Sequence, residues 1–154
     1  MKTYEPYPYS EMEIKSRIAE YAAKPLQHFT ETEAYRFILN VIDLTTLEGS
    51  DNKAKIEELC WKALSFKDEK RNIPATAAVC IYPPFVAQAK ALLKGTPVKV
   101  AAVAGAFPAG QSPLEVKLAE VDYTVAQGAD EIDMVISRGK FLEGNYEEVY
   151  DEIV

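Results

Sequence analysis

Residues 127–145 read QGADEIDMVISRGKFLEGN, and this stretch decides the fold that we predict for the chain. Gly128 stands where a helix commonly ends in a left-handed conformation. The apolar run at residues 129–136, interrupted by acids, is typical of a strand, and a loop and a further helix start follow it. Side chains alternate between the two faces of a strand. One face therefore carries Ile132, Met134 and Ile136, and the other carries Glu131, Asp133 and Val135.

Asp133 is the first candidate for chemistry, because it is a carboxylate in the middle of an apolar run. Burying an unpaired carboxylate is costly, so we expect this side chain to have a cationic or hydrogen-bonding partner. The competing interpretation is structural, since a strand-end aspartate can cap backbone groups or pair with a structural lysine. The residues alone leave both interpretations open.

Strands and helices alternate from residue 40 onward. Helices are predicted after each strand, with N-terminal signals at Ser50, Ser112 and Asn145. This alternation implies an α/β fold with a parallel sheet covered by helices. Four such units are too few to close a barrel of eight, which takes about 250 residues. The strands are predicted at residues 40–45, 76–82, 98–103 and 129–136, and the first is expected to be buried.

Residues 1–39 precede this alternation. Tyrosine and proline recur over residues 1–9, which predicts an extended or disordered arm rather than a helix or a central strand. Ser10 with Glu13, and Thr30 with Glu33, match the capping box, so two helices are predicted after the arm. We therefore divide the chain into an N-terminal arm with a helical extension, residues 1–39, and a main domain, residues 40–154.

Composition excludes several classes of protein. The net charge of −7 argues against nucleic acid or an anionic membrane as the main partner. No apolar run approaches the roughly 20 residues that span a bilayer, and the N-terminus lacks a signal-peptide pattern. Cys60 and Cys80 have no metal-ligand spacing, which favours a reducing cytoplasm. His28 is the sole histidine, so a Ser–His–Asp triad or a multi-histidine metal site is not expected.

Polar side chains gather at the predicted carboxyl ends of the strands, where parallel α/β folds place their functional groups. If the face of Asp43 and Thr45 and the face of Cys80 look inward, they converge with Asp133 on one cavity. Two carboxylates could bind a divalent metal, but a third oxygen-rich ligand and a histidine are lacking, so no metal site is expected. Cys80 has no evident base, which favours a small buried residue over a nucleophile.

Four segments in register resemble the deoxyribose-phosphate aldolase family. They match in order and spacing over residues 40–154, about three quarters of the chain. The segments are IDLTTLEG at 42–49, AAVCIYPPFV at 77–86, AFPAGQS at 106–112 and GADEIDMVISRGKFLEGNY at 128–146.

The resemblance implies a (β/α)8 barrel, of which this chain would hold the first four βα units behind two helices. It also implies a lyase that needs no cofactor or metal and acts in deoxyribonucleotide catabolism. That family cleaves 2-deoxy-D-ribose 5-phosphate into D-glyceraldehyde 3-phosphate and acetaldehyde through a lysine Schiff base. Asp133 maps to the aspartate that transfers protons. The residues that map to the substrate pocket are Asp43, Thr45, Leu47, Cys80 and Phe107.

This chain also differs from the family that it resembles. The family's Schiff-base lysine, its partner lysine and the phosphate-binding loops belong to later strands, so none is expected in this chain. Lys99 and Lys140 are expected to face solvent, the latter from a loop. Ala106 stands where the family usually has asparagine before Phe-Pro.

Alone, the chain is therefore expected to be inactive, and to form a homo-oligomer or to pair with a missing C-terminal half. Its implied partners are a small phosphosugar and an aldehyde. Two alternatives remain. One is a non-catalytic half barrel that acts in structure or assembly. The other is a different barrel aldolase or a metal-dependent enzyme.

Overall fold

The computed structural model describes residues 8–24 and 29–154. Two compact units divide the chain, one ending at Tyr35 and the other running from Arg36 to Val154. Residues 1–7 of the predicted arm, and His28, lie outside the described residues. Within the described part, no helix has the length and apolar character that crossing a membrane demands.

The first unit contains helix α1, Glu11–Ala23, and the start of helix α2, Glu31–Leu39. Both predicted capping boxes are confirmed. The carboxylate of Glu13 accepts from the backbone N–H of Ser10 at 2.7 Å, and that of Glu33 accepts from the N–H of Thr30 at 2.8 Å. Each cap satisfies backbone groups that a helix start leaves without partners.

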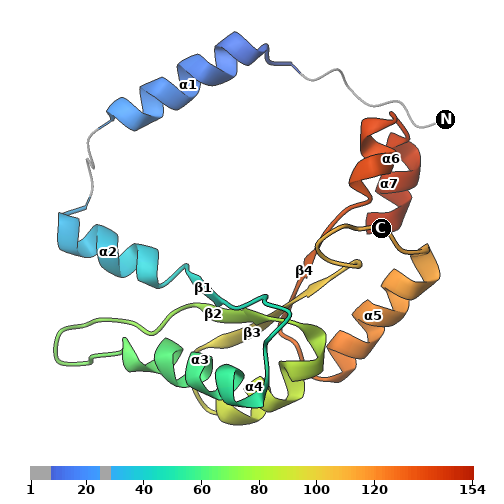
Figure 1. The fold of residues 1–154 in the computed structure, drawn as a ribbon. Helices are drawn as coiled ribbons and strands as arrows, with labels where there is room; N and C mark the ends of the chain where they lie inside the picture. Colours follow the sequence, from blue (N-terminus) through green and yellow to red (C-terminus); the bar gives the residue numbers. More distant parts are fainter. Residues whose placement is uncertain (1–7, 25–28) are drawn as a thin grey trace. The chain divides into compact units, whose positions relative to one another are not determined.

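The second unit is built on a parallel four-stranded sheet in the order β1-β2-β3-β4 (Figure 1). This confirms the predicted α/β class. Each strand is followed by one or more helices. The strands are β1 Asp43–Thr45, β2 Ala78–Ile81, β3 Lys99–Ala104 and β4 Glu131–Met134; the helices are α3 Lys53–Ser65, the short η1 Pro83–Phe85, α4 Val86–Leu92, α5 Leu114–Ala126, α6 Arg138–Leu142 and α7 Tyr146–Ile153.

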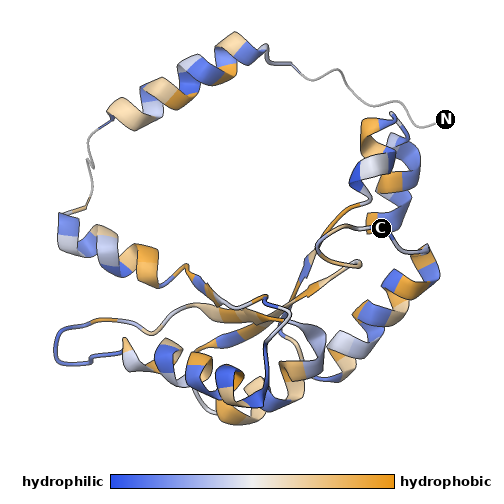
Figure 2. Cartoon of the chain, viewed as in Figure 1, coloured by the Kyte–Doolittle hydropathy of each residue, from blue (hydrophilic) through white to orange (hydrophobic). Residues whose placement is uncertain are grey.

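The core lies between one face of the sheet and the helices α3 and α4, which run along the same side of it (Figure 1). Ile56 and Cys60 of α3 pack with Val79 and Ile81 of β2 and with Val100 of β3, and all five are almost fully buried. The central strands β2 and β3 are coloured mostly as apolar in Figure 2, whereas the helices alternate between polar and apolar residues. Burial of this apolar face is the main force that holds the sheet together.

The outer strands are shorter and more exposed than expected. The prediction of a buried strand over residues 40–45 is wrong, because β1 covers three residues and Asp43 and Thr45 are exposed. Strand β4 likewise covers four residues of the predicted eight. Each of these two strands has one neighbour within the described sheet, so one backbone edge and much side-chain surface stay open.

Helix boundaries also differ from the predictions. Helix α3 begins after Asn52, whose side-chain oxygen accepts from the N–H groups of Ala54 and Lys55 at 3.1 and 3.2 Å. Helix α5 starts one residue later than predicted, with Pro113 in place of Ser112 at its N-cap. The short helix α6 was not predicted, and it places Lys140 on a helix rather than in a loop.

The cap at Asn52 gives a direct stability prediction. Replacing Asn52 by alanine leaves two backbone donors without their acceptor, so the free energy of unfolding should fall by about 1 kcal/mol. Ser50→Ala is the matched control and should change it by less than about 0.5 kcal/mol. Urea unfolding of both variants checks this, and equal losses from the two would contradict the assignment of the cap.

Candidate active site

The predicted site residues share the face of the sheet that α3 and α4 do not cover. Thr45 pairs in register with Cys80, and Cys80 pairs with Ala101, while Asp133 pairs with Val103. Because side chains alternate along each strand, these positions point to the same side. The predicted parity is therefore confirmed. We call this side of the sheet the inner face, and define it by Asp43, Thr45, Ala78, Cys80, Lys99, Ala101, Val103, Glu131 and Asp133.

The centre of the inner face is a small apolar cluster near the carboxyl ends of the strands. Cys80 and Val103 are buried beneath Leu47, Tyr82 and Phe107. The rings of Tyr82 and Phe107 meet edge to face with their centroids 6.2 Å apart, and the Tyr82 hydroxyl donates to the Leu47 carbonyl at 3.4 Å. The structure thus brings together three predicted pocket residues, and Tyr82 joins them as a wall residue.

Cys80 is a buried thiol and a poor nucleophile. Burial, and to a smaller extent the nearby Asp133 and Asp43 carboxylates, raise the pKa of Cys80 to about 11, while a hydrogen bond with Thr45 acts in the opposite direction. At neutral pH almost none of this thiol is ionised, and the thiolate is the reactive form. The interpretation of Cys80 as a small packing residue agrees with this environment.

Asp43 sits among like charges. Burial raises the pKa of the Asp43 carboxyl, and Glu131 and Asp133 add to this, while Lys99 acts in the opposite direction. The hydroxyl of the next pocket residue, Thr45, donates to the backbone carbonyl of Asp43 at 2.9 Å. The inner face therefore carries an excess of negative charge around its apolar centre.

The side chain of Asp133 does not have the environment that the sequence predicted. The residue is exposed, and across residues 8–24 and 29–154 no hydrogen-bond or ion-pair partner contacts its carboxylate. The expectation of a shielded carboxylate with a cationic or hydrogen-bonding partner is wrong for this chain. The reason is that Asp133 lies on the outer strand β4, where the inner face has no cover.

The loop at residues 105–110 forms the upper wall of the apolar cluster. The backbone N–H of Ala106 donates to the Glu120 carboxylate at 2.8 Å, and Ala106 takes a positive φ of 62°. Gly105 and Gly110 let the loop approach the chain after β4, since a Cβ on either would lie 2.7 and 2.5 Å from the carbonyl oxygens of Val135 and Ile136. Asparagine tolerates positive φ better than alanine, so the departure at residue 106 has a conformational cost.

The lysines near the site are paired. Lys99 lies on the inner face with its Nζ 2.6 Å from a carboxylate oxygen of Glu131, and a hydrogen bond and the charge of Glu131 raise the pKa of Lys99. Lys140 pairs with Glu148, and the hydrogen bond between them raises the pKa of Lys140. Both amines are charged at neutral pH, which does not suit a nucleophile.

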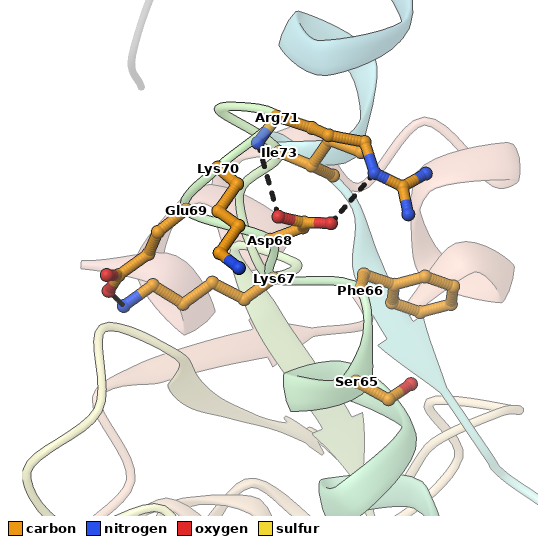
Figure 3. A pocket seen from close by; sticks show the side chains of 8 residues that line it. All are labelled: Ser65, Phe66, Lys67, Asp68, Glu69, Lys70, Arg71 and Ile73. Carbon is orange, nitrogen blue, oxygen red and sulfur yellow. Dashed lines mark hydrogen bonds and ion pairs between the residues drawn. The ribbon is translucent and has the colours of Figure 1, made fainter.

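The hollow of about 640 Å³ beside residues 65–73 is not part of this face (Figure 3). It lies on the connection into β2, away from the carboxyl ends of the strands. Its centre holds the Asp68 carboxylate, which pairs with the Arg71 guanidinium at 2.9 Å, while Lys67 pairs with Glu69 at 2.9 Å (Figure 3). Within the described chain, no three acidic, cysteine or histidine side chains form a group that could hold a metal ion.

Sequence reasoning missed a buried polar cluster behind this face. Lys117 and Ser137 are almost fully buried, and both contact the Glu152 carboxylate. The three residues come from α5, from the loop after β4 and from α7, so no local pattern could have revealed them. A lysine at a helix position flanked by apolar residues was the sole hint.

The amino-acid sequence of the chain is similar to those of known proteins. No family model matches the chain. Human deoxyribose-phosphate aldolase is 44% identical over 125 residues, which covers 73% of this chain and 38% of the human protein. The enzyme of the same name from Caldicellulosiruptor saccharolyticus is 42% identical over 116 residues, covering 75% of this chain and 49% of the relative. The chain therefore spans less than half the length of these relatives.

Solved structures agree with the sequence relatives. The deoxyribose phosphate aldolase of Aeropyrum pernix, described as a tetramer, superposes with a TM-score of 0.62 at 28% identity. It covers 77% of this chain and 45% of its own. The aldolase QR15 gives a TM-score of 0.65 at 30% identity, over 75% of this chain and 47% of its own. The fold is thus that of part of a (β/α)8 barrel aldolase. The chain belongs to the deoxyribose-phosphate aldolase family.

The environment of Cys80 predicts slow alkylation. At pH 8 the folded chain should react with iodoacetamide on the order of 100-fold more slowly than the guanidinium-unfolded chain, and the rate should rise toward pH 11. Cys60, which is also buried and whose pKa burial also raises to about 11, serves as the internal comparison. Peptide mass mapping separates the two thiols. Labelling of Cys80 at the unfolded rate would contradict its burial.

The positive φ of Ala106 predicts a stabilising substitution. Ala106→Gly removes the clash of Cβ with its own backbone and should raise the free energy of unfolding by about 0.5–1 kcal/mol, net of the added flexibility of the unfolded chain. Ala109→Gly in the same loop is the control, and it should be neutral or destabilising, because Ala109 has no positive φ. Thermal unfolding of both variants tests this prediction. A loss of stability in Ala106→Gly would contradict the positive φ at residue 106.

Proposed function

We propose that this chain supplies the proton-transfer side of a deoxyribose-phosphate aldolase site. The proposal rests on one observation above all: Asp43, Thr45, Cys80 and Asp133 fall in register on one face, beside the apolar wall of Phe107. Relatives with 42–44% identity that carry this name support it. The reaction proposed is the reversible cleavage of 2-deoxy-D-ribose 5-phosphate to D-glyceraldehyde 3-phosphate and acetaldehyde.

In this proposal Asp133 accepts and returns protons at the reacting carbons. A carboxylate in that role needs an ionised form at neutral pH and a position within hydrogen-bond reach of the substrate or a bridging water. Asp133 is directed to the inner face from a strand end, which suits such a position. The buried Cys80 and the ring of Phe107 would line the small space for the acetaldehyde-derived carbons, and Asp43, Thr45 and Leu47 would border it.

The Schiff-base lysine and the phosphate site would come from another segment of chain. The lysines near the face are committed to carboxylates, and Asp133 faces solvent without the ammonium groups that would shield it. Closing the inner face would exclude water and strengthen the electrostatic interactions of Asp133. We infer that the active species is formed when the inner face is covered by the other part of the barrel.

Complementation tests the assignment of Asp133. The chain would be combined with the segment of the human relative that follows the aligned 125 residues, and acetaldehyde release from 2-deoxy-D-ribose 5-phosphate would be measured. The mixture should cleave the substrate, and Asp133→Asn should lower kcat by at least about 100-fold. Glu131→Gln, two residues away on the same face, should stay within about threefold.

Three outcomes would contradict the proposal. Equal activity of the Asp133→Asn and Glu131→Gln mixtures would remove Asp133 from the chemistry. A stable complex without any cleavage would favour the non-catalytic assembly role. Activity that depends on added divalent ions would instead indicate a metal-dependent enzyme.

The open edges of the sheet generate a prediction about assembly. Strands β1 and β4 each leave one side unpaired within the described sheet, and exposed apolar side chains such as Val41, Met134 and Leu142 lie on or near the outer strands and α6. Such edges pair with other chains. Sedimentation analysis of the chain alone should therefore show dimers or larger species. A monomer that unfolds cooperatively would contradict this.

A further inference from the structure

A buried, charge-balanced cluster joins three elements behind the inner face. The Lys117 ammonium of α5 donates to the Ser137 hydroxyl and to Oε1 of Glu152 in α7, the latter at 2.7 Å. The Ser137 hydroxyl donates to the same Glu152 oxygen at 2.6 Å, and the Ser137 N–H donates to Oε2 at 3.2 Å. The three side chains thus form a closed ring of hydrogen bonds, which we call the Lys117 cluster.

The Lys117 cluster is shielded from water. The Lys117 and Glu152 side chains are 6% and 5% exposed, and Ser137 is buried as well. Burial opposes ionisation of Glu152, but the hydrogen bonds from Lys117 and Ser137 outweigh it and hold the pKa of Glu152 below its usual value. A buried ion pair adds little to stability compared with apolar residues of the same size, so its presence calls for another explanation, such as the fixing of one geometry.

The Lys117 cluster lies where the loop after β4 meets the 105–110 loop. The Ser137 hydroxyl also lies 3.3 Å from the carbonyl oxygen of Gly110, the last residue of the 105–110 loop. One residue further along, the Arg138 guanidinium donates to the Pro108 carbonyl at 2.9 Å. The contacts of Gly105 and Gly110 with the chain after β4 leave no room for a side chain at either position. The two loops are therefore packed directly against each other.

One face of α5 anchors both loops. Lys117 and Glu120 are three residues apart and thus lie on the same side of the helix. Lys117 holds Ser137 after β4, while the Glu120 carboxylate accepts from the backbone of Ala106 at 2.8 Å. The 105–110 loop carries Phe107, and the loop after β4 begins two residues after Asp133. The anchors on α5 therefore contact the residue before Phe107 and the segment that follows Asp133.

We propose that Lys117, Ser137 and Glu152 are positioning residues, which lock the loop after β4 to the 105–110 loop and so set Asp133 and Phe107 relative to each other. The catalytic meaning of this arrangement rests on the proposed aldolase function, whereas the structural coupling does not. The three side chains are buried and contact one another, so we assign none of them a contact with the substrate. Glu152 acts from α7, so the site geometry depends on the docking of that helix.

The test compares two ion pairs of the same chemistry in the chain by two-dimensional amide NMR. The double variant Lys117→Met with Glu152→Leu removes the buried pair without leaving an unpaired charge. Lys140→Met with Glu148→Leu is the matched control, because it removes an exposed pair that joins α6 to α7. The first variant should shift or broaden the amide signals of residues 105–110 and 133–138 and leave those of α3 and α4 in place. The control should leave the 105–110 signals unchanged.

Signals of residues 105–110 that stay in place in the Lys117→Met/Glu152→Leu chain would overturn the proposal. If that chain failed to fold, Ser137→Ala removes a single hydroxyl, and the same two loops should still respond. Unchanged loop signals in the Ser137→Ala chain would be equally decisive against it.

A second readout concerns catalysis in the complemented assembly. A positioning role predicts that Ser137→Ala lowers kcat by about tenfold with KM changed less than about twofold, because misplaced groups cost turnover more than binding. An unchanged kcat in an active assembly would refute the catalytic part. If the assembly with the unaltered chain were inactive, the proposed function would fail, while the NMR comparison would still decide on the coupling of the loops.

Discussion

The structure depends on the burial of one face of a four-stranded parallel sheet beneath α3 and α4. Ile56 and Cys60 from one helix meet Val79, Ile81 and Val100 from the central strands, and this packing aligns the strands in register. Once that register is set, alternation alone sends Cys80 and Asp133 to the opposite face. The position of the candidate site residues is thus a consequence of how the opposite, apolar face packs.

The inner face has two parts that differ in their exposure to solvent. Its apolar centre at Cys80, Tyr82 and Phe107 is packed, whereas the carboxylates of Asp43 and Asp133 lie on outer strands with open edges. Negative charge gathered at a surface is tolerated in water, but in a closed barrel it would call for cations opposite. The charge pattern of this face therefore fits a partner surface that carries ammonium groups.

Much of this arrangement could be predicted from the sequence, because it follows from local rules. The period of two along the stretch around Asp133 gave the correct face, and the pairs Ser10–Glu13 and Thr30–Glu33 gave two helix starts. What failed depended on contacts between distant segments. The apolar run around Asp133 predicts a shielded carboxylate, but a half barrel leaves the inner face uncovered at β4, so the surroundings of Asp133 were wrongly predicted. Nor could the sequence show Lys117, whose partner Glu152 lies 35 residues away.

We propose that Asp133 of this chain is the proton-transfer aspartate and that the Schiff-base lysine comes from another segment. The most direct test is to incubate the chain with acetaldehyde, reduce it with borohydride and map the modified lysines by peptide mass. The account predicts no lysine modified beyond the level of the guanidinium-unfolded chain, because Lys99 and Lys140 are held as charged ion pairs. A single specific adduct, suppressed by 2-deoxy-D-ribose 5-phosphate, would contradict it and place the nucleophile within these 154 residues.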